Sequence, residues 1–251
     1  SVMVAPRDML RMALVGFIGV TVLEIAVMYS IKWTTLANAS LLNVAPWPIF
    51  TALLAPLFTR EKITGRLIGA GLVSLVGVCL VILGGSDGFD LSGEHMIGNL
   101  LALGVSFIGA IFNLASIPLM RKYSPLRVST WTIAFGALFM FPVTIGSWSK
   151  VDWTGLTFSH HASIFYNVVF ATVVSFVVWN ACMYRVGGTR ANFFRYTVPI
   201  TAMVEGYVLF RESISLLQIG GALIVVLALV WISRDASGVK REQAEPAGMN
   251  T

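Results

Sequence analysis

Two carboxylates lie inside long apolar stretches of the chain, where an ionised side chain is costly. Glu24 stands about midway along the apolar run 12–31, and Glu205 lies in the run 191–210. A charged group at the bilayer centre costs roughly 2.5–3.5 kcal/mol on insertion scales, so a carboxylate there is a functional candidate by default. Each could exchange a proton or bind the amine of a ligand. The alternative is a structural carboxylate that is paired, or kept neutral by burial.

A polar stripe runs along one face of the apolar run 162–184. Thr172, Ser175, Trp179 and Cys182 are three, four and three residues apart, which places their side chains on one side of an α-helix. We expect this face to line a cavity, in which the indole ring of Trp179 would stack on a flat or cationic ligand. The alternative for this tryptophan is ordinary packing or a position at the membrane interface.

Other polar residues inside the apolar runs are weaker candidates for the same cavity, namely Tyr29, Asn43, Asn113, Asn180 and Tyr184. Asparagine in a membrane helix often only hydrogen-bonds a neighbouring helix. Arg195 lies about one turn inside the run 191–210, and its first interpretation is a long side chain that extends to the membrane interface. The alternative is a cation that binds a ligand carboxylate near Pro199.

The elements that must hold these residues are membrane helices. Of the 251 residues, 57% are hydrophobic and only 12% are charged, which is about half the charged fraction of a typical soluble domain. The strands of a membrane barrel would alternate in polarity, and these runs do not. A spanning helix needs roughly 20 apolar residues. The predicted fold class is therefore an all-α polytopic membrane protein with helices at about 12–31, 38–59, 66–84, 97–119, 127–148, 162–184, 191–210 and 214–233.

The basic residues divide unevenly between the two sides that eight alternating crossings define. The side with Lys32, Lys150 and Arg211 has no other Lys or Arg, whereas the opposite side has the remaining 14. Basic residues concentrate on the cytoplasmic side of membrane proteins, so we expect both termini of this chain to be cytoplasmic. The formal charge of +5 then reflects membrane topology, and nucleic acid is not an expected partner.

The chain contains an internal repeat. Residues 48–72 align with 199–223 at an offset of 151 without a gap, and the identities include Pro48 with Pro199 and the Arg-Glu pairs at 60–61 and 211–212. Shared apolar composition does not readily produce a proline, an Arg-Glu pair and a glycine in register. The charge pattern places the two Arg-Glu turns on opposite sides of the membrane, so the copies are inverted. Inverted repeats are a common plan of secondary transporters, with the site near the midplane.

Helix interruptions at matching positions in two repeats are a pointer to that site. Pro48 recurs as Pro199, whereas Pro46 and Pro56 have no counterparts and are interpreted as local kinks. We therefore add Pro48 and Pro199 to the candidate cavity residues. The dipeptides at 28–29 and 183–184, both Met-Tyr, also align, which leaves the runs 97–119 and 127–148 without partners. Two further helices upstream of Ser1 would complete a plan of five plus five.

The stretches 37–84 and 187–233 resemble the closing part of an EamA-type repeat of the drug/metabolite transporter (DMT) superfamily. Both have a helix with a proline, an Arg-Glu turn thirteen residues later, and a Gly-rich final helix. The resemblance implies a ten-helix carrier of two inverted five-helix repeats that moves small metabolites, often amino acids, usually outward. Residues 1–84 would be three helices of the first repeat, 85–96 a periplasmic linker, 97–234 the second repeat and 235–251 a disordered cytoplasmic tail. The segment GVSFIGAIFNLA departs from the family, which often has a Trp-Ala pair there, and this leaves the substrate open.

These features favour an alternating-access exporter of the bacterial inner membrane, acting on a small polar or cationic metabolite with the proton as candidate coupling ion. A membrane enzyme would need clustered acids, histidines or a nucleophile on facing helices; a receptor or structural subunit is the other alternative.

No catalytic residue, metal site or cofactor is predicted, and the G-x-x-x-x-G-K phosphate loop is absent. Glycines in 65–77 and 220–221 suit close helix packing, so a homodimer is a candidate assembly.

Overall fold

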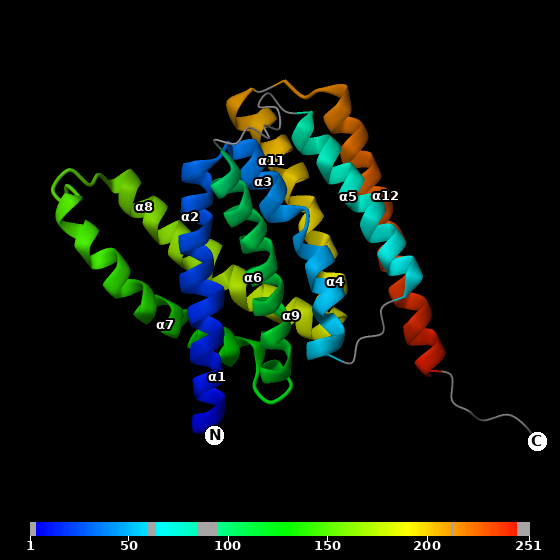
Figure 1. The fold of residues 1–251 in the computed structure, drawn as a ribbon, viewed down its shortest axis with the longest axis horizontal. Coiled ribbons are helices and arrows are strands. Elements are labelled where there is room, and N and C mark those ends of the chain that lie inside the picture. Colours follow the sequence, from blue (N-terminus) through cyan, green and yellow to red (C-terminus); the bar gives the residue numbers. More distant parts are fainter. Residues whose placement is uncertain (1–3, 60–63, 85–94, 212, 245–251) are drawn as a thin grey trace, which may run out of the picture.

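A computed structural model describes residues 4–59, 64–84, 95–211 and 213–244, and every regular element within these ranges is helical (Figure 1). Parts of both predicted Arg-Glu turns, at 60–61 and 212, lie outside the described residues, as does most of the predicted linker 85–96.

Six stretches of the described residues are long and apolar enough to cross a membrane: Pro6–Trp33, Asn38–Phe58, Gly65–Leu83, Met96–Met120, Pro125–Lys150 and Phe158–Val186. Leu216–Ile232 is a shorter apolar helix, and 188–210 is a series of short helical segments. Each of the eight predicted apolar runs is therefore helical. The protein is an all-α polytopic membrane protein, as its composition predicts.

Two of the long spans change helix type in their middle. The first consists of α1 (Pro6–Gly16), the π-helical η1 (Phe17–Val22) and α2 (Leu23–Trp33), and the other of α8 (Phe158–Tyr166), the π-helical η4 (Asn167–Val174) and α9 (Ser175–Val186). These are the two spans that the Met-Tyr dipeptides align. π-Helical turns are rare and occur frequently at functional sites.

Two other spans are interrupted. The first contains α3 (Leu36–Val44) and α4 (Trp47–Phe58), separated by Ala45 and Pro46. The second contains α10 (Gly188–Phe193), the 3₁₀ segment η5 (Phe194–Thr197), α11 (Val198–Glu205) and the π-helical η6 (Gly206–Phe210). Pro48 lies in the first turn of α4 and Pro199 in the first turn of α11. A missing backbone N–H breaks no helical hydrogen bond at these positions. Pro46 is at the first break itself, so it is more than the local kink that the repeat alignment suggested.

α6 (Met96–Met120) runs through the middle of the bundle, and about half of its residues are buried. It packs against α2, α3, α4 and α9. By contrast, α8 has no buried residue, and with α7 (Pro125–Thr144) and η3 (Ile145–Lys150) it forms one flank of the molecule in Figure 1. α6 is thus the scaffold against which the first interrupted span and α9 are positioned.

α5 (Gly65–Leu83) and α12 (Leu216–Ala244) lie side by side on the other flank (Figure 1). They cross closely at Gly77 and Gly221, because a Cβ added at Gly77 would lie only 2.8 Å from the carbonyl oxygen of Gly221. α12 continues to Ala244 and so includes residues 235–244, which the sequence analysis assigned to the tail. Lys, Arg, Glu, Gln and Ala there favour helix; residues 245–251 lie outside the described part.

Candidate functional site

The two interrupted spans touch at their breaks. Tyr196, in η5, is fully buried and donates its hydroxyl to the backbone carbonyl of Ala45, at a distance of 2.7 Å. Ala45 and Tyr196 are 151 residues apart, which is the offset of the internal repeat. The two aligned positions therefore contact each other directly.

Arg195 lies beside this contact and stacks on tryptophan. Its guanidinium carbon is 3.6 Å from the ring centroid of Trp47, the first residue of α4, and 5.7 Å from that of Trp179 in α9. The Arg195 Nε is buried and has no hydrogen-bond partner. The first interpretation, a side chain that extends to the membrane interface, did not include this stacking on tryptophans of two other helices. The Arg195 cation is held between aromatic rings.

A chain of side-chain amides connects three helices next to these rings. The indole Nε1 of Trp179 donates to Asn113 Oδ1 (3.2 Å), and the amide of Asn113 donates to Asn192 Oδ1 (2.7 Å). Asn192, in α10, in turn donates to the carbonyl of Gly188 (2.8 Å). Asn113 and Asn192 are fully buried, so these bonds fix the positions of α6, α9 and α10 around the break.

The position of Trp47 depends on a glycine in α6. A Cβ at Gly109 would lie 2.0 Å from the Trp47 ring, so only glycine leaves room for the indole at this point. Trp47 Nε1 is buried without a partner among the described residues, and so is the side-chain oxygen of Asn43, two residues before the break. Ser106 donates its hydroxyl to the backbone carbonyls of Leu42 and Asn43. The break thus carries unpartnered polar atoms beside a cation, an arrangement that can bind a small polar molecule.

We call Trp47, Asn113, Trp179, Asn192, Arg195 and Tyr196 the central cluster. Of the predicted cavity residues it includes Asn113 and Trp179, and Pro48 and Pro199 flank it in the first turns of α4 and α11. Trp47, Asn192 and the orientation of Arg195 were not predicted. The available signals were positional: Trp47 directly precedes Pro48, and Asn192 precedes Arg195 by three residues.

The other predicted cavity residues lie away from these contacts. Asn180 is buried but donates to the hydroxyl of Ser129 in α7 (2.7 Å), and Ser175 donates to the carbonyl of Phe170 in its own span. Tyr29 packs on Trp33 with ring centroids 5.0 Å apart. Three more have exposed side chains, namely Glu24, Tyr184 and Glu205. Their roles in a transport site stay predictions.

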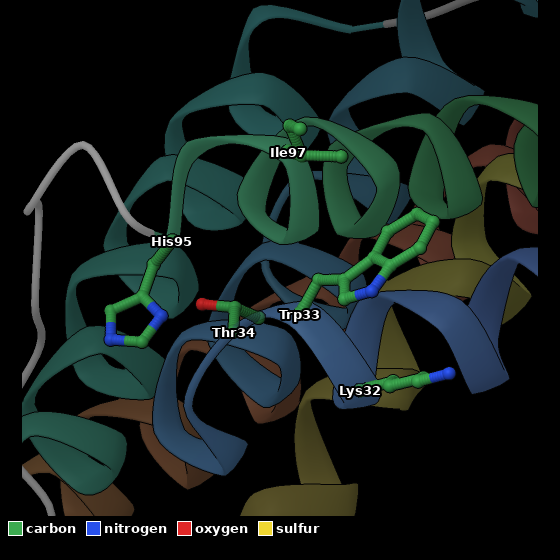
Figure 2. Close-up of a pocket in the computed structure, with 5 residues that line it drawn as sticks. All are labelled: Lys32, Trp33, Thr34, His95 and Ile97. Carbon is green, nitrogen blue, oxygen red and sulfur yellow. The ribbon is translucent and has the colours of Figure 1, made fainter.

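A pocket of about 400 Å³ lies at the end of α2 that is far from the N-terminus (Figure 2). Its lining residues are Lys32, Trp33, Thr34, His95 and Ile97. The Thr34 hydroxyl donates to Asn99 Oδ1 (2.6 Å), and the buried Asn38 amide donates to the same oxygen (3.0 Å). These bonds tie the start of α3 to α6, and the pocket opens beside them.

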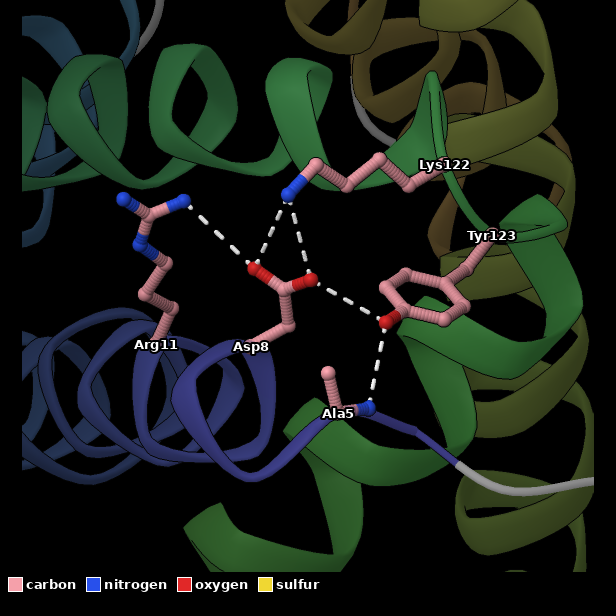
Figure 3. A network of polar contacts seen from close by, with 5 residues as sticks. All are labelled: Ala5, Asp8, Arg11, Lys122 and Tyr123. Carbon is pink, nitrogen blue, oxygen red and sulfur yellow. Dashed lines mark hydrogen bonds and ion pairs between the residues drawn. The ribbon is translucent and has the colours of Figure 1, made fainter.

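A charged network lies at the N-terminal end of the span Pro6–Trp33, opposite to this pocket (Figure 3). Asp8 is only 5% exposed, and its carboxylate accepts from Lys122 Nζ (3.2 Å), Tyr123 Oη (3.0 Å) and Arg11 (3.4 Å). The backbone N–H of Ala5 donates to the Tyr123 hydroxyl (3.2 Å). We call these residues the Asp8 cluster, and it joins α1 to the turn between α6 and α7.

Comparison with known proteins places the chain among transporters. The profile of the EamA-like transporter family matches residues 2–83 and 96–234. The uncharacterized transporter YetK of Bacillus subtilis (strain 168) is 24% identical over 220 residues, which are 88% of this chain and 66% of YetK. A probable terminal-alkyne amino-acid exporter of Streptantibioticus cattleyicolor is 23% identical over 96% of this chain and 78% of its own length. A solved crystal structure has the same fold, with a TM-score of 0.76 at 17% identity over 90% of this chain and 77% of that one.

Proposed function

This chain belongs to the EamA-like transporter family, and we propose that it is a secondary active transporter that exports small metabolites such as amino acids by alternating access. The relatives support a membrane transporter, and one of them is named a probable amino-acid exporter. The match covers 66% of the length of YetK.

The observation that carries the proposal is the contact between the two breaks. Two spans, each interrupted just before a proline, meet where Tyr196 donates to Ala45, and these two residues are separated by the repeat offset of 151. A two-fold axis between inverted repeats brings equivalent residues into contact wherever it passes. In such transporters the interrupted helices meet at the substrate site, and rocking of one repeat against the other exposes that site to each side in turn.

We propose the domain division that this symmetry implies. Residues 1–84 belong to the first repeat, 97–234 to the second, and the family profile also matches in two stretches, 2–83 and 96–234. The substrate site is the central cluster with Pro48 and Pro199. The basic side of the protein, which includes the Asp8 cluster, is cytoplasmic, and the bacterial inner membrane is its location.

We also propose that transport is coupled to protons through membrane carboxylates. Glu24 lies within the span Pro6–Trp33, two residues after the end of η1. Its carboxylate makes no hydrogen bond or ion pair to another described residue, which leaves it available to exchange a proton as the repeats move. Glu205 ends α11 at the junction with η6 and is the second candidate.

Proteoliposomes that contain the purified full-length protein provide the test. We expect flux of one or more amino acids from a panel, driven by an imposed pH gradient, and loss of that dependence in Glu24→Gln or Glu205→Gln with the fold intact. Gradient-driven flux that is equal in both variants and the wild type would remove the carboxylates from coupling. No flux of any panel member, under any gradient, would contradict the transport function itself.

A further inference from the structure

We propose that Arg195 binds a carboxylate of the transported substrate, so that the substrates are small carboxylic acids rather than cationic or neutral compounds. The inference rests on the proposed transport function and names the substrate class of the same site. It starts from a charge inside the protein that the described part of the chain does not balance.

Arg195 has no acidic partner among the residues that the structure describes. A guanidinium has five N–H donors and no acceptor, and in the described residues its contacts are with the faces of Trp47 and Trp179. Its Nε is buried without a hydrogen bond. Buried charges in proteins are normally paired, as Asp8 is with Lys122. Arg195 is partly buried, and a guanidinium whose Nε is buried without a hydrogen bond has the chemistry of a half-formed ion pair.

The tryptophans fix the arginine without using its donors. The guanidinium carbon lies over the Trp47 ring, 3.6 Å from its centroid, and the N–H groups of a guanidinium project from the edge of its plane. Arginine suits this arrangement because its planar fork matches the two oxygens of a carboxylate. The Trp47 ring is itself held by the space at Gly109. The site is therefore preorganised for a planar anion.

Two helix starts add positive potential at the same place. Trp47 is the first residue of α4, and Arg195 lies in η5, directly before α11. The N-terminus of a helix carries roughly half a positive charge, and half-helix N-termini face anionic substrate groups in other inverted-repeat transporters. The guanidinium offsets the charge of one carboxylate, and the two helix starts add to the attraction.

The same charges disfavour the cationic substrates that the sequence suggested. A ligand amine that stacked on the same face of Trp47 would have to displace Arg195, whose guanidinium carbon lies 3.6 Å from that ring centroid, and an amine on Trp179 would lie close to the same positive charge. A substrate that also has an amine is tolerated if its carboxylate binds the guanidinium. Zwitterionic amino acids and simple carboxylic acids are accordingly expected, whereas amides and decarboxylated amines are not.

The test uses matched compounds that differ only at the carboxylate. Proteoliposomes with full-length protein are assayed with L-leucine, L-leucinamide and isopentylamine, with L-phenylalanine, L-phenylalaninamide and phenethylamine, and with lactate and lactamide. We expect at least one acid to be transported at a rate at least tenfold above its amide and amine. Arg195→Gln should remove that preference, Arg195→Lys should retain part of it, and Arg185→Gln, at an exposed arginine of α9, should leave it unchanged.

The outcomes separate this inference from the transport function. Equal rates for acids and their amides, or an acid preference that persists in a folded Arg195→Gln variant, would overturn the role of Arg195 while transport stands. Absence of flux for every compound would contradict the transport function. Because a variant could lose activity by unfolding, each is first checked by thermal unfolding in detergent. Substrate-induced quenching of tryptophan fluorescence by the acids, and not by the amides, gives a binding readout that does not need turnover.

Discussion

The central cluster and the Asp8 cluster both bury charge between helices, but they treat it in opposite ways. Asp8 accepts hydrogen bonds from Lys122, Tyr123 and Arg11, so the anion is fully surrounded by donors. Arg195 stacks on two indole rings, and its Nε has no hydrogen-bond partner. One charge is satisfied by the protein and the other is not.

The difference indicates what each region does. A paired carboxylate between α1 and the turn from α6 to α7 has a structural role, since removal of its partners would leave the buried Asp8 anion poorly solvated. An unpaired guanidinium contributes less to stability, because its desolvation is offset only by cation–π attraction. The protein retains this charge at a cost, which is typical of a binding site.

The largest expected effect comes from removing each charge in turn. Arg195→Gln should reduce transport of the preferred carboxylate at least tenfold while the melting temperature stays the same or rises. Asp8→Asn should lower the melting temperature and leave substrate preference unchanged. Flux in proteoliposomes and thermal unfolding in detergent are compared for both variants. If Arg195→Gln were the more destabilising of the two, the contrast between the regions would be wrong.

A smaller effect is expected when Trp47, on which the Arg195 guanidinium stacks, is displaced. Gly109→Ala places a Cβ 2.0 Å from the Trp47 ring, so Trp47 and Arg195 must shift, at a cost of about 1–3 kcal/mol for overpacking. Gly104→Ala in the same helix is the matched control, because a Cβ there meets nothing within 4 Å. We expect Gly109→Ala to raise the substrate KM and lower stability, and the control to do neither. Similar behaviour of the two variants would mean that Trp47 does not position Arg195.

The amide chain gives a still smaller effect. Trp179→Phe keeps an aromatic ring near Arg195 but removes the donor to Asn113 Oδ1, which is worth about 1 kcal/mol for a hydrogen bond of this kind. We expect a modest loss of stability and a flux reduced several-fold, with the preference for acids retained. A loss of that preference would transfer the recognition role from Arg195 to Trp179.

The smallest effect is expected at the edge of the Asp8 cluster. Tyr123→Phe removes one of three donors to the carboxylate and the acceptor for the Ala5 N–H, while Lys122 and Arg11 remain. The melting temperature should fall less than in Asp8→Asn, and transport should be unaffected. A change in transport direction or rate without a change in stability would show that the Asp8 cluster moves during the cycle.

The sequence was sufficient for the helices but only partly for the site. The apolar runs and their lengths predicted the spans, because crossing a bilayer requires that composition whatever the tertiary contacts. Pro48 and Pro199 indicated the breaks because proline is favoured in the first turn of a helix. The position of Arg195 was not predictable, since it depends on Trp47 in another span and on the space that Gly109 leaves. Asn113 was one asparagine among several, and only the fold distinguishes its bond to Asn192 from the bond of Asn180 to Ser129.

The most direct test of the central claim is an experimental structure of the full-length protein with a transported carboxylate bound. The account predicts that the ligand carboxylate lies within hydrogen-bond distance of the Arg195 guanidinium, beside Trp47 and Trp179 at the junction of the two interrupted spans. A ligand bound instead in the pocket beside Trp33 and His95, or at the central cluster with its carboxylate directed away from Arg195, would contradict it.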